Sequence, residues 1–251
     1  FFSALLMVAP YAAQDVEIQV IGDLVSKPYI DMTIGSMRDF GVQVQNRVYQ
    51  SLRVRAGQRY TARDYSVEGD ASAASYFFAA AAIVGGKVRV EGIDRGSLQG
   101  DIGFLSVLEQ MGCTVRSGDG WAEVEGGKLR GVDVDMNAMS DVAQTLAAVA
   151  VFADGKTRIR NIAHVRGKET DRIAATATEL RKLGADVTEF PDGLEIAPCP
   201  PRRTEIATYD DHRMAMSFAL IGLRAPGIRI QNPGCVSKTF PNFFDELERL
   251  G

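Results

Sequence analysis

The sequence has few of the residues that build metal sites and disulfide frameworks. Its 251 residues include three cysteines, Cys113, Cys199 and Cys235, and two histidines, His164 and His212. The cysteines are odd in number and widely spaced, and the sequence contains no CxxC pair or His/Cys cluster, which argues against a disulfide framework and a zinc site. We therefore expect no metal and a reducing, cytoplasmic environment.

The chain also lacks a strong net charge and a long hydrophobic run. Lys and Arg number 28 and Asp and Glu 32, giving a formal net charge of -4, so no overall field attracts nucleic acid and any anion site must be built locally. The opening run FFSALLMVAP is too short to span a bilayer and lacks the basic flank and clear cleavage site of a signal peptide. We predict a buried helix there, and no nucleic-acid or membrane partner.

What the sequence does contain is an internal repeat of about 70 residues. Four segments share a polar start, a helical spacing of apolar residues and a closing glycine: 26–41, 97–112, 167–184 and 237–251. The closing glycines are Gly41, Gly112, Gly184 and Gly251, separated by 71 (41 to 112), 72 (112 to 184) and 67 (184 to 251) residues. Glycine directly after the last apolar position is typical of a helix C-terminus, because it adopts positive φ without penalty.

A second set of predicted helices follows the same period. They begin at Asp70, at Ser140-Asp141 and at Asp210-Asp211, all good N-cap residues. Each leads into a short β-like run, KVRVEGI, KTRIRNI or IRIQNP, and VQVQNRV, SLRVRAG and YSVEGD predict further strands. The unit is therefore helix, strand, helix, strand, strand, which predicts an α/β protein made of duplicated modules.

The first and last modules are incomplete. FFSALLMVAPYAAQDVEIQV matches the second half of MAMSFALIGLRAPGIRIQNP, but its N-cap and preceding strand are missing, and no strands follow the last helix. A helix that begins without a cap leaves its first N–H groups unsatisfied. We infer a fragment whose N-terminal portion is absent.

Cations recur at the predicted helix starts. RGKETDRI (166–173) places four charges between Lys168 and Arg172, and Lys27, Arg213 and Lys238 open other helices. A cation opposes the positive end of the helix dipole unless an anion binds between them. Phosphate and carboxylate groups satisfy both the amides and the cations, and Arg binds a carboxylate through two hydrogen bonds.

Ordinary structural roles also account for single residues in this set. Pairs such as Glu169–Arg172 and Lys168–Asp171 stabilise a solvated first turn, and Asp141 is a good N-cap. Two carboxylates among several cations are, however, also what paired acid–base chemistry needs. The recurrence favours an α/β repeat protein that binds a multiply anionic small molecule, with its reaction left open.

Six motifs resemble one known family. They are SKPYIDMT, VEGDASAASYFFAAAAI, QGDIGFLSVLEQMG, KETDRIAATATELRKLGAD, TYDDHRMAMSFAL and SKTFPNFFDEL. Together they resemble 5-enolpyruvylshikimate-3-phosphate synthase over essentially the whole chain, although that family's chain is longer at its N-terminus. The resemblance implies two inside-out α/β barrels of repeated βαβαββ units, with helix N-termini pointing into the cleft between them. Residues 1–68 would be the remaining part of the N-terminal barrel, and residues 69–251 most of the C-terminal barrel.

The resemblance also implies a reaction. The enolpyruvyl group of phosphoenolpyruvate is transferred to the 5-hydroxyl of shikimate 3-phosphate, and phosphate is released, by addition and elimination through a tetrahedral intermediate. This is a step of the shikimate pathway to the aromatic amino acids, and the family is the target of glyphosate. The resemblance implies neither a metal nor an organic cofactor. The implied partners are the two substrates and the missing N-terminal segment of the same enzyme.

Motif matching implies a role for individual residues. Asp141 falls on the base that acts on the 5-hydroxyl and contacts the shikimate ring, and Glu169 on the group that handles the proton at the methylene carbon. The phosphoenolpyruvate positions are matched by Arg172, Arg213 and Lys238. The other shikimate 3-phosphate positions are matched by Ser26, Tyr29 and Lys168. His164 stands where the family commonly has Asn; either side chain can hydrogen-bond the ligand, but the pH response would differ.

Several family features lie outside this sequence. The family's N-terminal substrate-binding Lys, Ser and Arg residues and its Ser-Ser-Gln run are not present, so we expect the chain alone to be inactive. One alternative is the sister enolpyruvyl transferase that acts on UDP-N-acetylglucosamine, against which KETDR and DDHRMAM argue. Another is a non-catalytic half that gains function only with a partner chain.

Overall fold

The computed structural model describes residues 1–250, which form two compact units. One unit comprises residues 1–68 together with 96–100, and the other comprises residues 69–95 together with 101–250. Each unit has its own hydrophobic core. The assignment of residues 1–68 and 69–251 to two barrels of the implied family stays a prediction.

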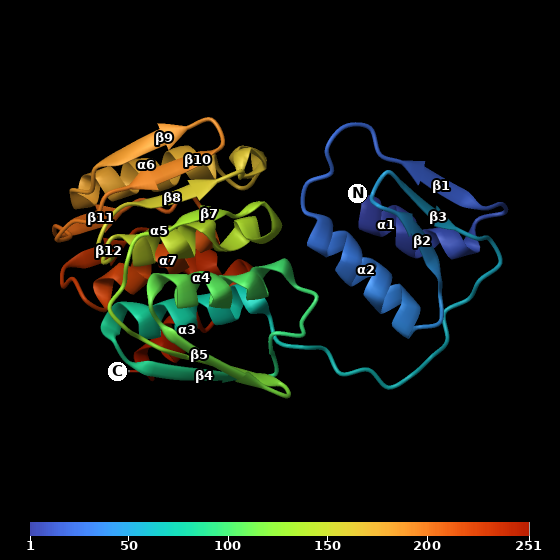
Figure 1. Ribbon diagram of the computed structural model, residues 1–251, viewed down its shortest axis with the longest axis horizontal. Coiled ribbons are helices and arrows are strands. Elements are labelled where there is room, and N and C mark those ends of the chain that lie inside the picture. The colour runs from blue at the N-terminus through green and yellow to red at the C-terminus, as the bar shows by residue number, and fades with distance from the viewer. Residues whose placement is uncertain (251) are drawn as a thin grey trace. The chain divides into compact units, whose positions relative to one another are not determined.

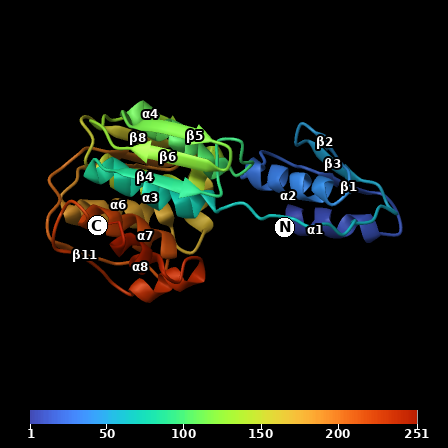
Figure 2. The same cartoon turned by 90° about the horizontal axis from the view of Figure 1, so that it is seen from below.

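The first unit is a small α/β sandwich. Its elements are α1 (Phe2–Val8), η1 (Ala9–Tyr11), β1 (Val16–Gln19), α2 (Lys27–Asp39), β2 (Val44–Arg47) and β3 (Ser51–Val54). The strands form an antiparallel sheet in the order β1-β3-β2, and α1 and α2 pack against each other beside it (Figure 2). Leu6, Ile30, Met37 and Leu52 supply much of the core between these layers.

The opening segment is a helix, as predicted, but it is not a buried one. Within α1 only Leu6 is fully buried, whereas Leu5, Met7 and Val8 are about half exposed. A seven-residue helix makes only two turns, and here a single face of it packs against α2. Among residues 1–250, no helix combines the length and apolar character needed to cross a membrane.

The second unit contains the rest of the repeat. Its helices and helical turns are α3 (Ala71–Val84), η2 (Gly100–Gly103, of which Gly100 counts with the first unit), α4 (Phe104–Met111), η3 (Asn137–Val142), α5 (Ala143–Ala150), η4 (Ala163–Gly167), α6 (Arg172–Leu183), α7 (His212–Gly222), η5 (Pro233–Lys238) and α8 (Phe243–Glu248). Its strands are β4 (Lys87–Glu91), β5 (Thr114–Gly118), β6 (Trp121–Glu125), β7 (Asp133–Asp135), β8 (Thr157–Arg160), β9 (Val187–Phe190), β10 (Gly193–Ile196), β11 (Thr204–Ile206) and β12 (Ile228–Ile230).

Helices α3, α5 and α7 occupy the inside of this unit, and its sheets lie around them. Figure 1 shows α5 and α7 between β9 and β10 on one side and β4 and β5 on the other. The sheets have the orders β4-β6-β5, β7-β8-β10-β9 and β11-β12. All eight residues of α5 are buried, and alanines there and in α3 let the helices α3, α5 and α7 approach closely. Thr145 and Ser217, 72 residues apart in successive modules, lie 3.3 Å apart between α5 and α7.

The predicted helix ends agree with the structure where it describes them. Gly41, Gly112 and Gly184 follow or cap their helices with φ of +90°, +109° and +100°. A Cβ at Gly112 would lie 2.6 Å from the carbonyl oxygen of Lys128, so this position also needs glycine for space. Gly251 lies outside the described residues.

Several predicted helix starts, and one strand, are wrong. YSVEGD (65–70) forms no strand. Lys168 and Glu169 precede α6, because Asp171 caps that helix by accepting from the Ala174 N–H. Lys238 ends η5, since Pro241 disfavours helical backbone at the residue before it and α8 begins only at Phe243.

Candidate active site

The buried guanidinium of Arg172, the first residue of α6, is the centre of a charged cluster. Its Nε donates to Asp211 Oδ2 at 2.8 Å, its Nη1 to Asp141 Oδ1 at 3.0 Å and its Nη2 to Glu169 Oε2 at 2.7 Å. A buried cation is tolerated only when it is paired and hydrogen-bonded. The cation that opens α6 is thus neutralised by carboxylates of this chain, two of them from other modules.

Asp211 links two helix starts. It is the N-cap of α7, where its Oδ1 accepts from the Arg213 N–H at 2.8 Å, and it is fully buried. The same carboxylate faces Arg172. The sequence correctly predicted the cap at Asp210-Asp211, but Asp211 was not predicted as a site residue.

Asp141 bridges two arginines. Its Oδ1 accepts from Arg172, its Oδ2 accepts from Arg213 Nη2 at 3.0 Å, and Lys168 Nζ lies 3.9 Å from Oδ1. Asp141 belongs to η3, and the N-cap position of α5 is occupied by Val142. The proposed N-cap role at the start of α5 is therefore wrong for Asp141.

Arg213 is also bound by buried polar side chains that the sequence did not reveal as functional. Its Nη1 donates to Tyr76 Oη and its Nη2 to Ser72 Oγ, each at 3.4 Å. Ser72 in turn donates to the buried carboxyl of Asp101. Burial raises the pKa of Asp101 to about 6, although the hydrogen bond from Ser72 opposes the shift. A usable signal was the position of Ser72 in the first turn of α3, which corresponds to that of Arg213 in α7.

Glu169 lies between Arg172 and Lys238. Lys238 Nζ is 2.5 Å from Glu169 Oε1. Burial alone raises the pKa of Glu169, but the hydrogen bond from Lys238 and the charges of Lys238 and Arg172 lower it to about 2. Glu169 is therefore ionised at neutral pH in this arrangement.

His164 lies at the edge of the cluster on η4. Its Nε2 is 2.9 Å from Ser140 Oγ, next to Asp141. Burial and the nearby Lys168 charge lower the pKa of His164. The imidazole is therefore mostly neutral at pH 7 and can donate or accept one hydrogen bond, as the amide of Asn does.

The structure thus brings together seven of the predicted site residues. They are Asp141, His164, Lys168, Glu169, Arg172, Arg213 and Lys238. Ser26 and Tyr29 belong to the first unit, where Ser26 precedes α2 with φ of +58° and Tyr29 is exposed. Their participation in the site stays a prediction.

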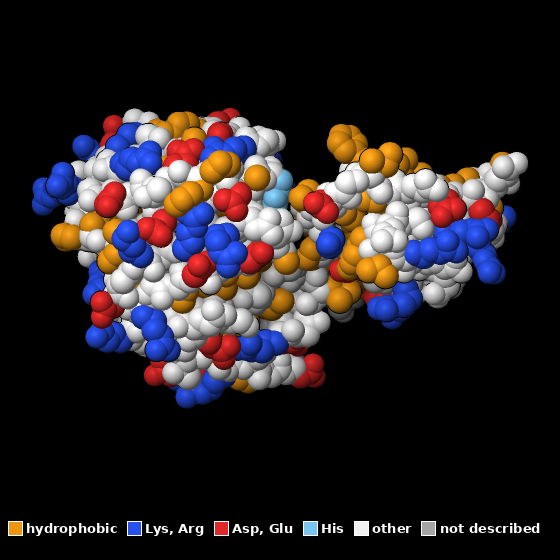
Figure 3. Space-filling view, turned by 45° about the horizontal axis from the view of Figure 1, so that its top comes forward, with side chains coloured by type: hydrophobic (Ala, Val, Ile, Leu, Met, Phe, Trp, Pro, Cys, Tyr) orange, Lys and Arg blue, Asp and Glu red, His pale blue; other side chains and the backbone are white. Residues whose placement is uncertain are grey.

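Surface charge on the second unit is mixed. Figure 3 shows Lys and Arg interspersed with Asp and Glu on the face in view. On this face the cations therefore form no extended basic surface. Among residues 1–250, no three His, Cys, Asp or Glu side chains are grouped to hold a metal ion.

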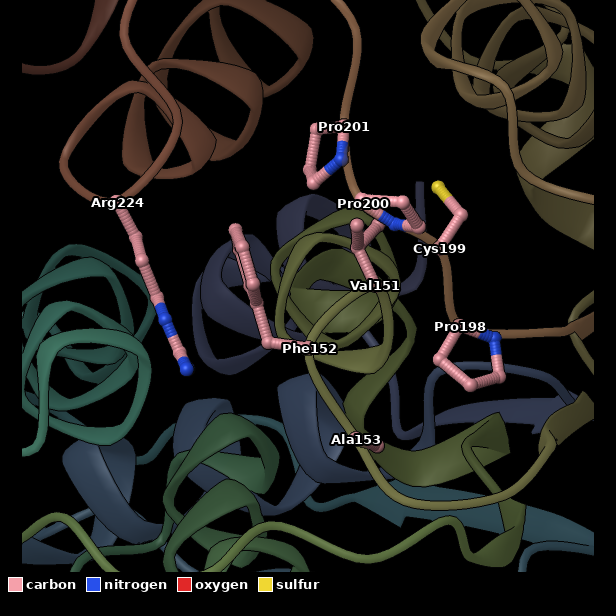
Figure 4. Close-up of a pocket in the computed structure, with 8 residues that line it drawn as sticks. All are labelled: Val151, Phe152, Ala153, Pro198, Cys199, Pro200, Pro201 and Arg224. Atoms are coloured by element: carbon pink, nitrogen blue, oxygen red, sulfur yellow. The ribbon is translucent and has the colours of Figure 1, made fainter.

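A separate hollow of about 460 Å³ lies at the C-terminal ends of α5 and α7, whereas the charged cluster lies at their N-terminal ends. Its lining is shown in Figure 4 and includes Phe152, Cys199, Pro200 and Arg224. Arg224 follows the last turn of α7, whereas Arg213 belongs to its first. None of the predicted site residues lines this hollow.

Comparisons with known proteins identify the family of the chain. A family model described as EPSP synthase (3-phosphoshikimate 1-carboxyvinyltransferase) matches residues 1–247. The chain is 57% identical over 249 residues to the 3-phosphoshikimate 1-carboxyvinyltransferase of Nostoc punctiforme, covering 99% of this chain and 58% of that protein. It is 55% identical over 252 residues to the enzyme of that name from Proteus mirabilis, covering 100% and 59%.

Solved structures show the same fold. An EPSP synthase structure from Acinetobacter baumannii superposes with a TM-score of 0.83 at 27% identity, covering 98% of this chain and 59% of that one. The enolpyruvyl transferase NikO from Streptomyces tendae has a TM-score of 0.75 at 22% identity, covering 99% and 58%, and supports the fold alone. The predicted enolpyruvyl transferase fold is confirmed, and the chain spans less than three-fifths of the length of these relatives. Its motifs, its fold and its sequence identity together place the chain in the EPSP synthase family.

Proposed function

We propose that this chain is the portion of an EPSP synthase that carries the acid–base groups of enolpyruvyl transfer. The substrates are phosphoenolpyruvate and shikimate 3-phosphate, and the products are the 5-enolpyruvyl ether and phosphate. The single observation that carries the proposal is the convergence of Arg172, Arg213, Lys168 and Lys238 around Asp141 and Glu169. Relatives that share more than half of its residues bear the name of that enzyme.

The cations suit anionic substrates. Arg172 and Arg213 each direct an Nη2 toward a carboxylate, Glu169 and Asp141 respectively, so a substrate carboxylate can share these donors. Lys238 has a side chain that is 56% exposed, which leaves it accessible to a phosphate oxygen. Lys168 beside Asp141 is assigned to shikimate 3-phosphate.

Asp141 is assigned the role of base in the addition step. It takes the proton of the 5-hydroxyl while that oxygen forms a bond to C2 of phosphoenolpyruvate, and C3 gains a proton from Glu169. Two guanidiniums at 3.0 Å fix both oxygens of Asp141, which favours orientation of the acceptor hydroxyl. Elimination then breaks the C2–O bond to phosphate, and the Glu169 carboxylate takes a proton from C3, which restores the double bond. The departing phosphate takes the proton held by Asp141.

Glu169 must be protonated before it can act as an acid. The hydrogen bond from Lys238 is the strongest of the interactions that lower its pKa. A substrate phosphate that takes over Lys238 would remove this hydrogen bond and raise the pKa of Glu169. Binding of phosphoenolpyruvate would therefore favour the protonated form of Glu169, which is the form that can donate a proton to C3.

The remaining partners are proposed on the same grounds. The chain would work together with the N-terminal portion that its longer relatives possess. A cytoplasmic location is supported by the free thiols of Cys113, Cys199 and Cys235, since a reducing compartment keeps cysteines unpaired.

The test is phosphate release from phosphoenolpyruvate and shikimate 3-phosphate. The chain is assayed alone and mixed with the N-terminal two-fifths of the Nostoc punctiforme relative. We expect turnover in the mixture, reduced about 100-fold or more by Asp141→Asn or Glu169→Gln. Asp154→Asn is the matched control, because Asp154 is exposed and its carboxylate pairs with Lys128 at the surface.

Two other results would redirect the assignment. Phosphate release with UDP-N-acetylglucosamine, but not with shikimate 3-phosphate, would support the sister transferase. Absence of turnover with both segments folded and associated would contradict the enzyme and leave the non-catalytic half.

A further inference from the structure

Glu179, on α6, is a fully buried carboxylate that the proposed chemistry does not use. It lies two turns after Arg172 and is bound by three groups. Lys182 Nζ donates to its two oxygens at 2.7 and 2.9 Å, Tyr209 Oη at 2.7 Å and the Ala207 N–H at 3.2 Å. Lys182 alone would neutralise the charge of Glu179. The two further donors, Tyr209 Oη and the Ala207 N–H, also connect Glu179 to the segment 207–211.

This segment joins β11 to α7 and has an unfavourable backbone. Tyr209 and Asp210 are consecutive non-glycine residues with φ of +54° and +56°. Such conformations persist only where surrounding contacts hold them. The contacts here are the two donors to Glu179, a hydrogen bond from Asn232 Nδ2 to Asp210 Oδ1 at 3.0 Å, and the Asp211 N–H bonded to Thr208 at 2.8 Å.

Helix α6 therefore binds this segment at two points. At its first residue, Arg172 binds Asp211, and seven residues later Glu179 binds Ala207 and Tyr209. The left-handed turn at Tyr209 and Asp210 lies between these two contacts and sets the direction of the Asp211 carboxylate. Asp211 in turn caps α7 at Arg213 and faces Arg172.

We propose that Glu179 is a positioning residue for the site: through Tyr209 and Ala207 it holds the left-handed turn that sets Asp211 against Arg172 and the start of α7. Its catalytic consequence rests on the function proposed above, but its structural part does not. Burial and the neighbouring Glu179 raise the pKa of Tyr209 to about 12, which keeps its hydroxyl a donor across the working pH range.

The test uses Tyr209→Phe in the full chain, because this variant removes only the hydroxyl of a partly exposed ring. The first readout is the NMR signal of the Arg172 Nε–H, which donates to Asp211, and the second is hydrogen exchange at the Arg213 amide. We expect the Nε–H signal to shift and the amide to exchange at least about fivefold faster. Tyr60→Phe is the matched control, since its hydroxyl binds the Met7 carbonyl in the other unit, and it should leave both readouts unchanged.

Glu179 itself is tested by a pair of variants. Glu179→Gln keeps one oxygen that can accept from the Ala207 N–H, and its amide NH2 can donate to Tyr209 Oη, whereas Glu179→Leu can bond to neither group. We expect Glu179→Gln to retain the Arg172 signal and Glu179→Leu to lose it. If Glu179→Leu does not fold, Tyr209→Phe still decides, and unchanged Arg172 and Arg213 signals in that variant overturn the proposal.

Phosphoenolpyruvate affinity separates this proposal from the assigned function. Weaker binding by Tyr209→Phe, together with the spectral changes, supports both. Spectral changes in a chain that binds no phosphoenolpyruvate, even with the N-terminal portion added, support the positioning role and count against the assigned function.

Discussion

Arg172 and Asp211 form an ion pair between two buried side chains that are 39 residues apart in the sequence. Arg172 Nε lies 2.8 Å from Asp211 Oδ2, and the side chains are 2% and 0% exposed. Because Asp211 also caps α7, this pair connects the first residue of α6 to the first turn of the next helix. The Asp211 carboxylate therefore contributes both to the charge balance of Arg172 and to the geometry of the site.

Asp211→Asn tests this dependence. It leaves the buried Arg172 with one fewer anion, and breaking a buried pair typically costs about 3–5 kcal/mol. We expect a loss of this size in the free energy of unfolding, measured by urea titration. Asp133→Asn is the control, because Asp133 pairs with Arg160 at the surface and should cost less than about 1 kcal/mol. Equal losses in the two variants would show that burial does not matter here.

The ionised state of Glu169 predicts weaker stability in acid. Its pKa is lowered from 4.5 to about 2, so the ion pair with Lys238 and Arg172 contributes fully above pH 4.5 and is lost as pH falls through 2. The contribution is about 1 kcal/mol, because the group is partly solvated and screened. Urea unfolding at pH 6, 4 and 3 should show a steeper decline for the parent chain than for Glu169→Gln.

Asp101 predicts the opposite pH response. Burial raises its pKa from 3.8 to about 6, so the folded state binds the proton more tightly and loses stability as pH rises from 3.8 through 6. Asp101→Asn removes this cost and keeps an oxygen that accepts from Ser72. We expect the variant to gain up to about 3 kcal/mol at pH 8, and much less at pH 4. A gain that is equal at both pH values would rule out ionisation of Asp101 as its cause.

Adjacent leucines in α1 give a matched pair. Leu6 is fully buried, whereas Leu5 is 53% exposed. Leu6→Ala should cost about 2–5 kcal/mol in the first unit, and Leu5→Ala less than about 0.5 kcal/mol. Thermal unfolding followed by the fluorescence of the tyrosines in this unit measures both. Similar costs for the two would mean that Leu5 is covered in solution.

Much of the local structure could be predicted from the sequence. The closing glycines Gly41, Gly112 and Gly184 and the caps Asp70 and Asp211 are confirmed, because each depends on a backbone conformation or a hydrogen bond within a few residues. The helix starts near Lys168 and Lys238 were wrong, since nearby 3₁₀ turns and a proline displace the first α-helical turn.

The sequence by itself determined the repeat, the helix ends and the presence of cations near helix starts. Only the tertiary structure decided how those cations are balanced. Arg172 meets Asp141 and Asp211 across 31 and 39 residues, and Arg213 meets Asp141 across 72. Pairing at such separations depends on how whole modules pack around α3, α5 and α7. It therefore cannot be predicted from the residues that neighbour each charge in the sequence.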